Sequence, residues 1–177
     1  MDKRLEAAVE IGVENGVSRE SGPEQVEGAI TELSIEYLSF MLGGEEYGIK
    51  VSGVREAIRP IEILEVPRVP EYVKGIISLR GMVIPVFDLK RRLGFTESPA
   101  TLRTRVIVAA QSKNLYGLLV DSVVGVIPVF SNRVEIPPHG LRKGAEFVKG
   151  VVHYASREGR ELDRFLILLN LEKVLTT

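Results

Sequence analysis

Few residues of this chain could do chemistry, and their spacing argues against catalysis. The 177 residues include no cysteine, which excludes disulfides, thiolate nucleophiles and cysteine-ligated zinc. The two histidines are His139, which follows two prolines, and His153, which lies in an apolar run. Neither has a second histidine at metal-ligand spacing, so the sequence predicts no metal centre.

The carboxylates offer no obvious catalytic partner either. Asp121 lies in a Val-Asp-Ser-Val stretch with no histidine nearby, and we expect it to cap a turn between two strands. The chain has no GxGxxG, GxxxxGK[ST] or GxSxG motif. We therefore predict a non-enzymatic protein without a cofactor. The alternative is an enzyme in which folding brings a histidine to Asp121 or Asp88.

Arg80 is the charged residue whose surroundings most suggest recognition. It stands between the apolar run Ile77-Ser78-Leu79 and Gly81. One interpretation is a surface arginine whose stem covers apolar neighbours. The other is an arginine held between the bends at Gly75 and Gly81, where it contacts a carboxylate of the fold or of a partner.

Short apolar runs rich in β-branched residues, separated by turn signals, indicate that strands carry these side chains. The Gly43-Gly44 pair predicts a tight turn between the first two. Helical signals are few: Asp88 can cap a short helix over 89–93 that Gly94 ends. The predicted strands are 37–42, 45–51, 82–87, 105–110, 115–120, 123–127 and 165–169.

The strand-rich part of the chain repeats itself. The Tyr-Gly-[Ile/Leu]-x-Val pattern at Tyr47 returns at Tyr116, and Val-Lys-Gly at Val73 returns at Val148. The landmarks keep their order while their offset grows from 69 to 82 residues. We therefore expect one unit of about seventy residues used twice, over roughly 34–104 and 105–177. The glycines of the first pattern, Gly48 and Gly117, are expected to curve their strands.

Charge separates an N-terminal tail from this body. Residues 1–32 hold three basic and eight acidic side chains, a net charge of −5, so a flexible acidic tail is predicted over 1–33. The whole chain has a net charge of −1 and 6% aromatic residues, which disfavours the alternative of a nucleic-acid-binding module. No apolar stretch approaches 18 residues, so we predict a cytoplasmic protein without membrane insertion.

Linked motifs in residues 34–177 resemble the CheW-like domain family. They are Tyr-Gly-Ile-x-Val-x-x-Val-x-Glu from Tyr47, Gly-Ile-Ile-Ser-Leu-Arg-Gly-x-Val-Ile-Pro-Val-x-Asp-Leu from Gly75, and Gly-Leu-Leu-Val-Asp-Ser-Val from Gly117. The resemblance implies a mainly β fold of two five-stranded SH3-like barrels around a shared core, with few short helices. It also implies a non-catalytic adaptor, monomeric outside receptor arrays, that joins the regulatory domain of the histidine kinase CheA to the cytoplasmic tip of methyl-accepting chemoreceptors.

The family resemblance also places candidate binding residues. Kinase contact in the family uses hydrophobic barrel ends, which the sequence does not map to residues. Some features depart from the family pattern: Ser78 replaces a common asparagine, Asn170 replaces a common aspartate, and the loop 156–164 is long. An adaptor of a paralogous chemosensory pathway is therefore an alternative. The receptor seam between the halves is predicted at Val54, Glu56, Gly75, Arg80, Gly81, Val120 and Val123.

Overall fold

A computed structural model describes residues 33–96, 99–136, 144–154 and 164–176 of the chain. Residues 32–177 form one compact unit. This unit is mainly β with few short helices, which confirms the predicted fold class. Two predicted segments lie almost entirely outside the described residues: the acidic tail over 1–33 and the charged loop 156–164. Only the last residue of each is described.

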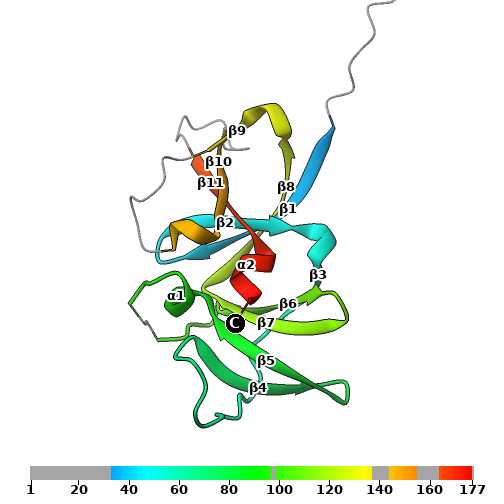
Figure 1. Ribbon diagram of the computed structural model, residues 1–177, viewed down its shortest axis with the longest axis vertical. Helices are drawn as coiled ribbons and strands as arrows, with labels where there is room; N and C mark the ends of the chain where they lie inside the picture. The colour runs from blue at the N-terminus through cyan, green and yellow to red at the C-terminus, as the bar shows by residue number, and fades with distance from the viewer. Residues whose placement is uncertain (1–32, 97–98, 137–143, 155–163, 177) are drawn as a thin grey trace, which may run out of the picture. The chain divides into compact units, whose positions relative to one another are not determined.

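The described strands form two sheets (Figure 1). All seven strands predicted from apolar runs are found. The six-stranded sheet has the order β8-β1-β2-β11-β10-β9, with β1 (Ser34–Leu42), β2 (Glu45–Lys50), β8 (Ser122–Phe130), β9 (Val134–Glu135), β10 (Val148–Tyr154) and β11 (Arg164–Leu169). The five-stranded sheet has the order β3-β6-β7-β5-β4, with β3 (Val54–Ile58), β4 (Val73–Leu79), β5 (Met82–Asp88), β6 (Arg105–Gln111) and β7 (Asn114–Val120).

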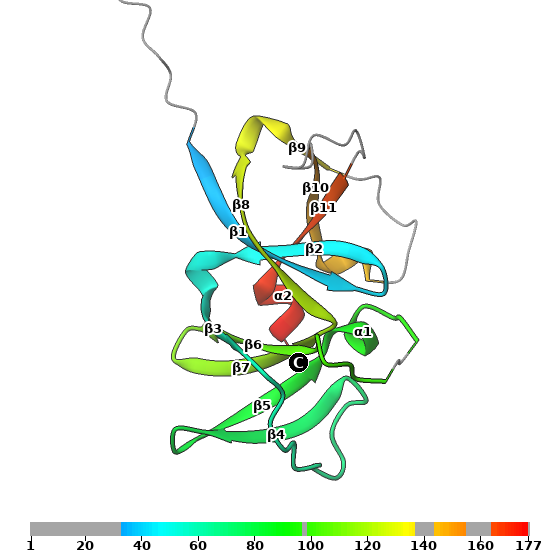
Figure 2. The ribbon, with the colours of Figure 1, turned by 180° about the vertical axis from the view of Figure 1, so that it is seen from behind.

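Each sheet takes strands from both sequence repeats. The short 3₁₀ turn η1 (Val51–Gly53) carries the chain from β2 into β3 of the other sheet. In the second repeat, Asp121 alone separates β7 from β8, which pairs with β1 (Figure 2). The repeats over 34–104 and 105–177 are therefore not separate barrels, because the chain changes sheet after the second strand of each.

Closure of the sheets differs from the expected pair of five-stranded barrels. One sheet has six strands, and among the described strands neither hydrogen-bonded ladder returns to its first strand. In the six-stranded sheet, β8 and β9 lie at opposite edges. The 3₁₀ turn η2 (Ser131–Arg133) joins these two strands, so one continuous chain segment connects the two edges. In the other sheet, the segment after β3 returns at Leu64, which exchanges two 2.9 Å hydrogen bonds with Ile76 of β4.

Equivalent glycines allow these closing segments to approach. Gly75 and Gly150 both lie at irregularities in strand pairing. A Cβ on Gly75 would overlap the Leu64 carbonyl oxygen, and a Cβ on Gly150 would overlap the Val134 side chain. The repeated Val-Lys-Gly motif therefore marks the point where each sheet receives its closing segment.

Three hydrophobic clusters stabilise the unit, as expected for two barrel-like halves around a shared core. The smaller ones lie within the six-stranded and five-stranded sheets, around Leu166 and Ile84. The largest draws on both sheets and on the helices α1 (Leu89–Arg92) and α2 (Leu171–Leu175). Its fully buried side chains include Phe40, Leu42, Ile49, Leu89, Ile107 and Leu118.

Local sequence explains the helices, and packing explains two glycines inside strands. Asp88 caps α1 by accepting the Arg91 N–H, as predicted, and Asn170 caps α2 in the same way, a helix that the sequence did not predict. The pairing of β2 and β7 shows no register shift at Gly48 or Gly117. Both glycines allow close packing: a Cβ on Gly117 would lie 2.9 Å from a Val106 methyl group.

Candidate partner-binding site

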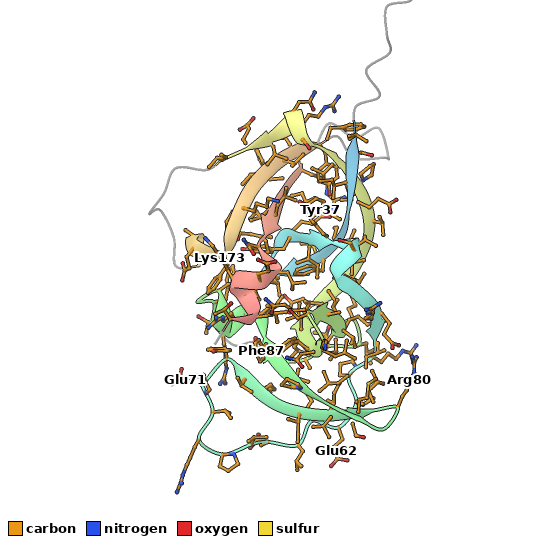
Figure 3. All side chains as sticks on the ribbon, turned by 45° about the vertical axis from the view of Figure 1, so that its right-hand side comes forward. Tyr37, Glu62, Glu71, Arg80, Phe87 and Lys173 are labelled. Carbon is orange, nitrogen blue, oxygen red and sulfur yellow. The ribbon has the colours of Figure 1, made fainter. Side chains whose placement is uncertain are left out.

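Arg80 and Gly81 form the two-residue turn between β4 and β5, at the tip of the hairpin (Figure 3). Their φ angles are +51° and +79°, which is the pattern of a type I′ hairpin turn. A positive φ is ordinary for glycine and uncommon for arginine. The turn therefore holds the Arg80 backbone in a fixed direction away from the sheet.

The Arg80 side chain contacts Glu56 on β3. Its Nη2 lies 3.0 Å from Glu56 Oε2, and this contact is both an ion pair and a hydrogen bond. The Arg80 side chain is 72% exposed and that of Glu56 is 28% exposed. The structure therefore answers the question that the sequence left open: Arg80 contacts a carboxylate within the fold, while most of its guanidinium faces solvent.

The other predicted seam residues have different positions. Val54, Val120 and Val123 all belong to or pack against the shared hydrophobic cluster, and Val120 is only 2% exposed. Gly75 is buried at the closure of the five-stranded sheet, whereas Gly81 is exposed with open space around it. Of the seven residues, Arg80 and Glu56 are the ones that present charged side chains.

Asp121 has a structural role that involves three elements. One of its carboxylate oxygens accepts the Gly43 N–H at 2.8 Å, and the other pairs with Lys90 of α1. Its own N–H donates to the Met41 carbonyl at 3.0 Å. Asp121 thus stabilises the β1–β2 turn as well as the link between β7 and β8. It does not act as a catalytic base in this arrangement.

No catalytic or metal constellation is present in the described ranges. His153 lies on β10 with its ring 5.0 Å from that of Phe165, and Asp88 caps α1. Among the described residues, no group of three or more His, Cys, Asp or Glu side chains could hold a metal ion. No helix within those residues is both long and apolar enough to cross a membrane.

The sequence did not predict a buried polar network around Glu46. Glu46 is 6% exposed and accepts hydrogen bonds from the hydroxyls of Ser39 and Tyr154, and it pairs with Arg164 at 2.7 Å. Burial, followed by the hydrogen bond to Glu46, raises the pKa of the Tyr154 hydroxyl. Local sequence carried no signal for this network, because its members are up to 118 residues apart.

Two grooves with mixed polar and apolar linings occupy equivalent places in the two sheets. One, of about 460 Å³, lies beside β5 and the β6–β7 hairpin and includes Val83 and Leu115. The other, of about 310 Å³, lies beside β11 and the start of β2 and includes Phe165 and Glu46. Val83 and Phe165 stand 82 residues apart, which is the repeat offset, and they are 68% and 59% exposed. Both grooves expose apolar surface.

Known proteins resemble this chain along most of its length. The model of the CheW-like domain family matches residues 36–177. Chemotaxis protein CheW of Treponema pallidum is 32% identical over 157 residues, covering 84% of this chain and 86% of that protein. Protein FrzA of Myxococcus xanthus is 30% identical over 142 residues, covering 80% and 86%.

A solved structure agrees with both the sequence match and the fold. The scaffolding protein TtCheW from Thermoanaerobacter tengcongensis has a TM-score of 0.72 and 31% sequence identity, covering 82% of this chain and 90% of its own. The family motifs contain the Arg80 turn, Glu56 and the Asp121 link described above. The chain therefore belongs to the CheW-like family, the non-catalytic scaffolding adaptors of chemotaxis signal transduction.

Proposed function

We propose that the chain joins the cytoplasmic tip of methyl-accepting chemoreceptors to the regulatory domain of the histidine kinase CheA. Receptor binding recruits the adaptor to membrane receptor arrays, and the adaptor sets kinase activity by holding both partners in one geometry. The observation that carries the receptor part is the exposed Arg80, which its turn and Glu56 hold in place.

The receptor surface is built around the Arg80–Glu56 pair. Only one nitrogen of the guanidinium contacts Glu56. Among the described residues its remaining N–H donors contact no other group, so they can bind a carboxylate of the receptor tip, which arginine recognises well through this fork. Val54, Val120 and Val123 support the surface from below through the shared cluster.

The two equivalent grooves, with their exposed apolar side chains, are the candidate kinase surfaces. The resemblance to the family implies hydrophobic barrel ends as kinase contacts, and the structure exposes Met82 and Val83 at one groove and Phe165 at the other. Exposed apolar side chains in a groove favour protein contacts. Two such grooves let one adaptor bind one kinase and link to a second, which is what a scaffold of an array requires.

A three-component pull-down tests this function. The components are the full-length protein, the kinase regulatory domain and a receptor signalling tip, and the variants are Arg80→Glu and Arg80→Asn. Asparagine tolerates a positive φ, so the second variant removes the charge without straining the turn. We expect both variants to keep the kinase and lose the receptor, with Arg80→Glu losing more because it places a second carboxylate beside Glu56.

The outcomes separate the parts of the proposal. Circular dichroism must first show that both variants are folded, which we expect because a surface ion pair contributes no more than about 1 kcal/mol. Folded variants that retain the receptor would place its site elsewhere on the molecule. A wild-type protein that binds neither partner would refute the coupling function itself. Each single contact should have a Kd of roughly micromolar order, about −8 kcal/mol, as suits an exchangeable adaptor.

A further inference from the structure

Two clefts occupy equivalent positions beside the two short helices. The cleft near α1 has a volume of about 430 Å³, and the one near α2 about 580 Å³. Residues that line one cleft occupy the same positions in their sequence repeat as residues that line the other. Lys74, Asp88, Lys90 and Asp121 of the first cleft correspond to Lys149, Asn170, Glu172 and Ser52 of the second.

The charges of the first cleft balance within the protein. It contains two lysines and two aspartates. Lys90 pairs with Asp121, and Asp88 caps α1 with one of its oxygens. A cleft with equal numbers of buried or half-buried cations and anions has no need of an external ion.

The second cleft also holds two lysines, but both aspartate positions have lost their charge, and Glu172 stands where the first cleft has Lys90. Asn170 and Ser52 stand at the aspartate positions, Lys149 keeps the position of Lys74, and Lys50 is added. No ion pair joins Lys50 or Lys149 to a carboxylate within the part of the chain that the structure describes. Two ammonium groups therefore share this cleft, and no carboxylate among the described residues pairs with either of them.

The protonation of Lys149 reflects this arrangement. Burial, and then the charge of neighbouring Lys50, lower its pKa below the ordinary value for lysine. A bound anion would offset the repulsion between the two ammonium groups. Glu172 is the one carboxylate among the residues that line this cleft, and its position corresponds to Lys90.

We propose that Lys50 and Lys149 form a binding site for an oxyanion, either a phosphate or the carboxylate of an acidic side chain. Ser52, Gln111 and Ser112 line the same cleft and supply polar hydrogen-bonding groups. Asn170 uses its oxygen to cap α2, so its NH₂ group remains as a donor that Asp88 does not have.

An NMR titration of the full-length protein with ¹³C-labelled lysine tests the site, with inorganic phosphate as the probe and chloride at matched ionic strength as the reference. We expect saturable shifts of the Lys50 and Lys149 signals and an increase in the Lys149 pKa on phosphate binding. Lys149→Gln should weaken phosphate binding about tenfold or more, because it removes a charged hydrogen bond. The matched variant Lys74→Gln, in the balanced cleft, should leave phosphate affinity unchanged.

A second variant avoids any loss of folding. Asn170→Asp keeps the cap of α2, as Asp88 caps α1, and restores a carboxylate to the cleft. It should weaken phosphate binding about fivefold or more, since a nearby carboxylate repels the anion. Two results would refute the site. One is a phosphate-induced NMR shift at Lys74 as large as that at Lys149, and the other is a phosphate affinity unchanged in both Lys149→Gln and Asn170→Asp.

The source of the anion is decided by repeating the titration with each protein partner present. A partner that supplies a carboxylate should displace phosphate from the Lys149 signals, whereas a site for a free phosphate should retain it. Either result supports an oxyanion site. The first titration needs no partner, so its failure is distinguishable from a failure of the coupling function.

Discussion

Glu46 shows how one residue stabilises the six-stranded sheet. Its carboxylate lies on β2 and binds Arg164 and Tyr154, which come from β11 and β10. A buried carboxylate is costly unless its hydrogen-bonding capacity is satisfied, and here three side chains including Ser39 satisfy it. This network therefore fixes the two C-terminal strands against the first hairpin.

Ionisation of the Tyr154 hydroxyl at alkaline pH is expected to destabilise the folded protein. Its pKa is raised in the folded state, so its contribution is complete below the unfolded-state pKa of about 10 and is lost as the pH rises through the folded value. We expect Tyr154→Phe to lower the free energy of unfolding by about 1–2 kcal/mol at neutral pH. The variant should also lose less stability than wild type above pH 10.

Urea unfolding between neutral pH and pH 11 measures both effects. Tyr116→Phe serves as the control, since the Tyr116 hydroxyl makes no hydrogen bond among the described residues. A Tyr154→Phe variant whose stability falls with pH as steeply as that of wild type would contradict the argument.

At the scale of elements, each sheet depends on a segment that closes it. The Leu64 segment bonds to β4 beside Gly75, where φ is +149°. A side chain at Gly75 meets backbone, which cannot move aside as a flexible side chain can. Closure therefore requires glycine at this position.

Gly75→Ala should lower the free energy of unfolding by about 3 kcal/mol or more, since it adds a backbone clash to a strained φ. Gly44→Ala is the matched control, because Gly44 also has a positive φ, +88°, but open space around it. Its cost should be about 1–2 kcal/mol. Urea denaturation compares the two, and equal costs would show that φ alone, rather than closure, explains the effect.

Arg92 joins the two short helices. Its guanidinium donates to the Val174 carbonyl at 3.0 Å and to the Thr176 carbonyl, at the end of α2, and lies 4.0 Å above the Tyr72 ring. The last carbonyls of a helix have no intrahelical partners, so these bonds act as a C-terminal cap of α2. One side chain of α1 thus holds the end of α2.

Arg92→Ala should lower the free energy of unfolding by about 2 kcal/mol, through lost hydrogen bonds and the lost cation–π contact. Arg92→Lys keeps the charge but not the planar fork, so it should recover less than half of this loss. Thermal and urea unfolding measure the difference. Full recovery by lysine would show that charge alone matters at the end of α2.

At the scale of the whole molecule, the exchange of strands makes the two repeats interdependent. The repeat 34–104 supplies β1 and β2 to a sheet whose other strands come from 105–177. The shared cluster also takes side chains from both repeats. Each repeat alone would leave apolar strand faces exposed and sheet edges unpaired.

The fragment 33–104 is therefore expected to remain unfolded in isolation. Far-UV circular dichroism should show little β structure, and urea should produce no cooperative transition. Mixing or co-expression with 105–177 should restore a cooperative transition, because the missing strands then become available. A fragment that folds alone with a cooperative transition would contradict the observed strand exchange.

Much of the candidate site was predictable from sequence because its signals are local. The Leu-Arg-Gly turn, the Asp88 cap and the apolar runs lie in contiguous residues, where turn propensity, capping and alternation act. The family motifs placed Arg80 and Glu56 at one surface, and the structure brings them together. What local signals could not provide was the burial of Val120 and Gly75, because burial depends on packing.

The sequence by itself determined seven of the eleven described strands, the internal repeat, the family and the absence of cysteine chemistry. Only the tertiary structure decided which sheet each strand joins, that Asp121 binds Gly43 and Lys90, and that Lys50 and Lys149 share a cleft. The physical reason is that strand pairing is chosen by the burial of apolar faces across long sequence separations, whereas propensities act over a few residues.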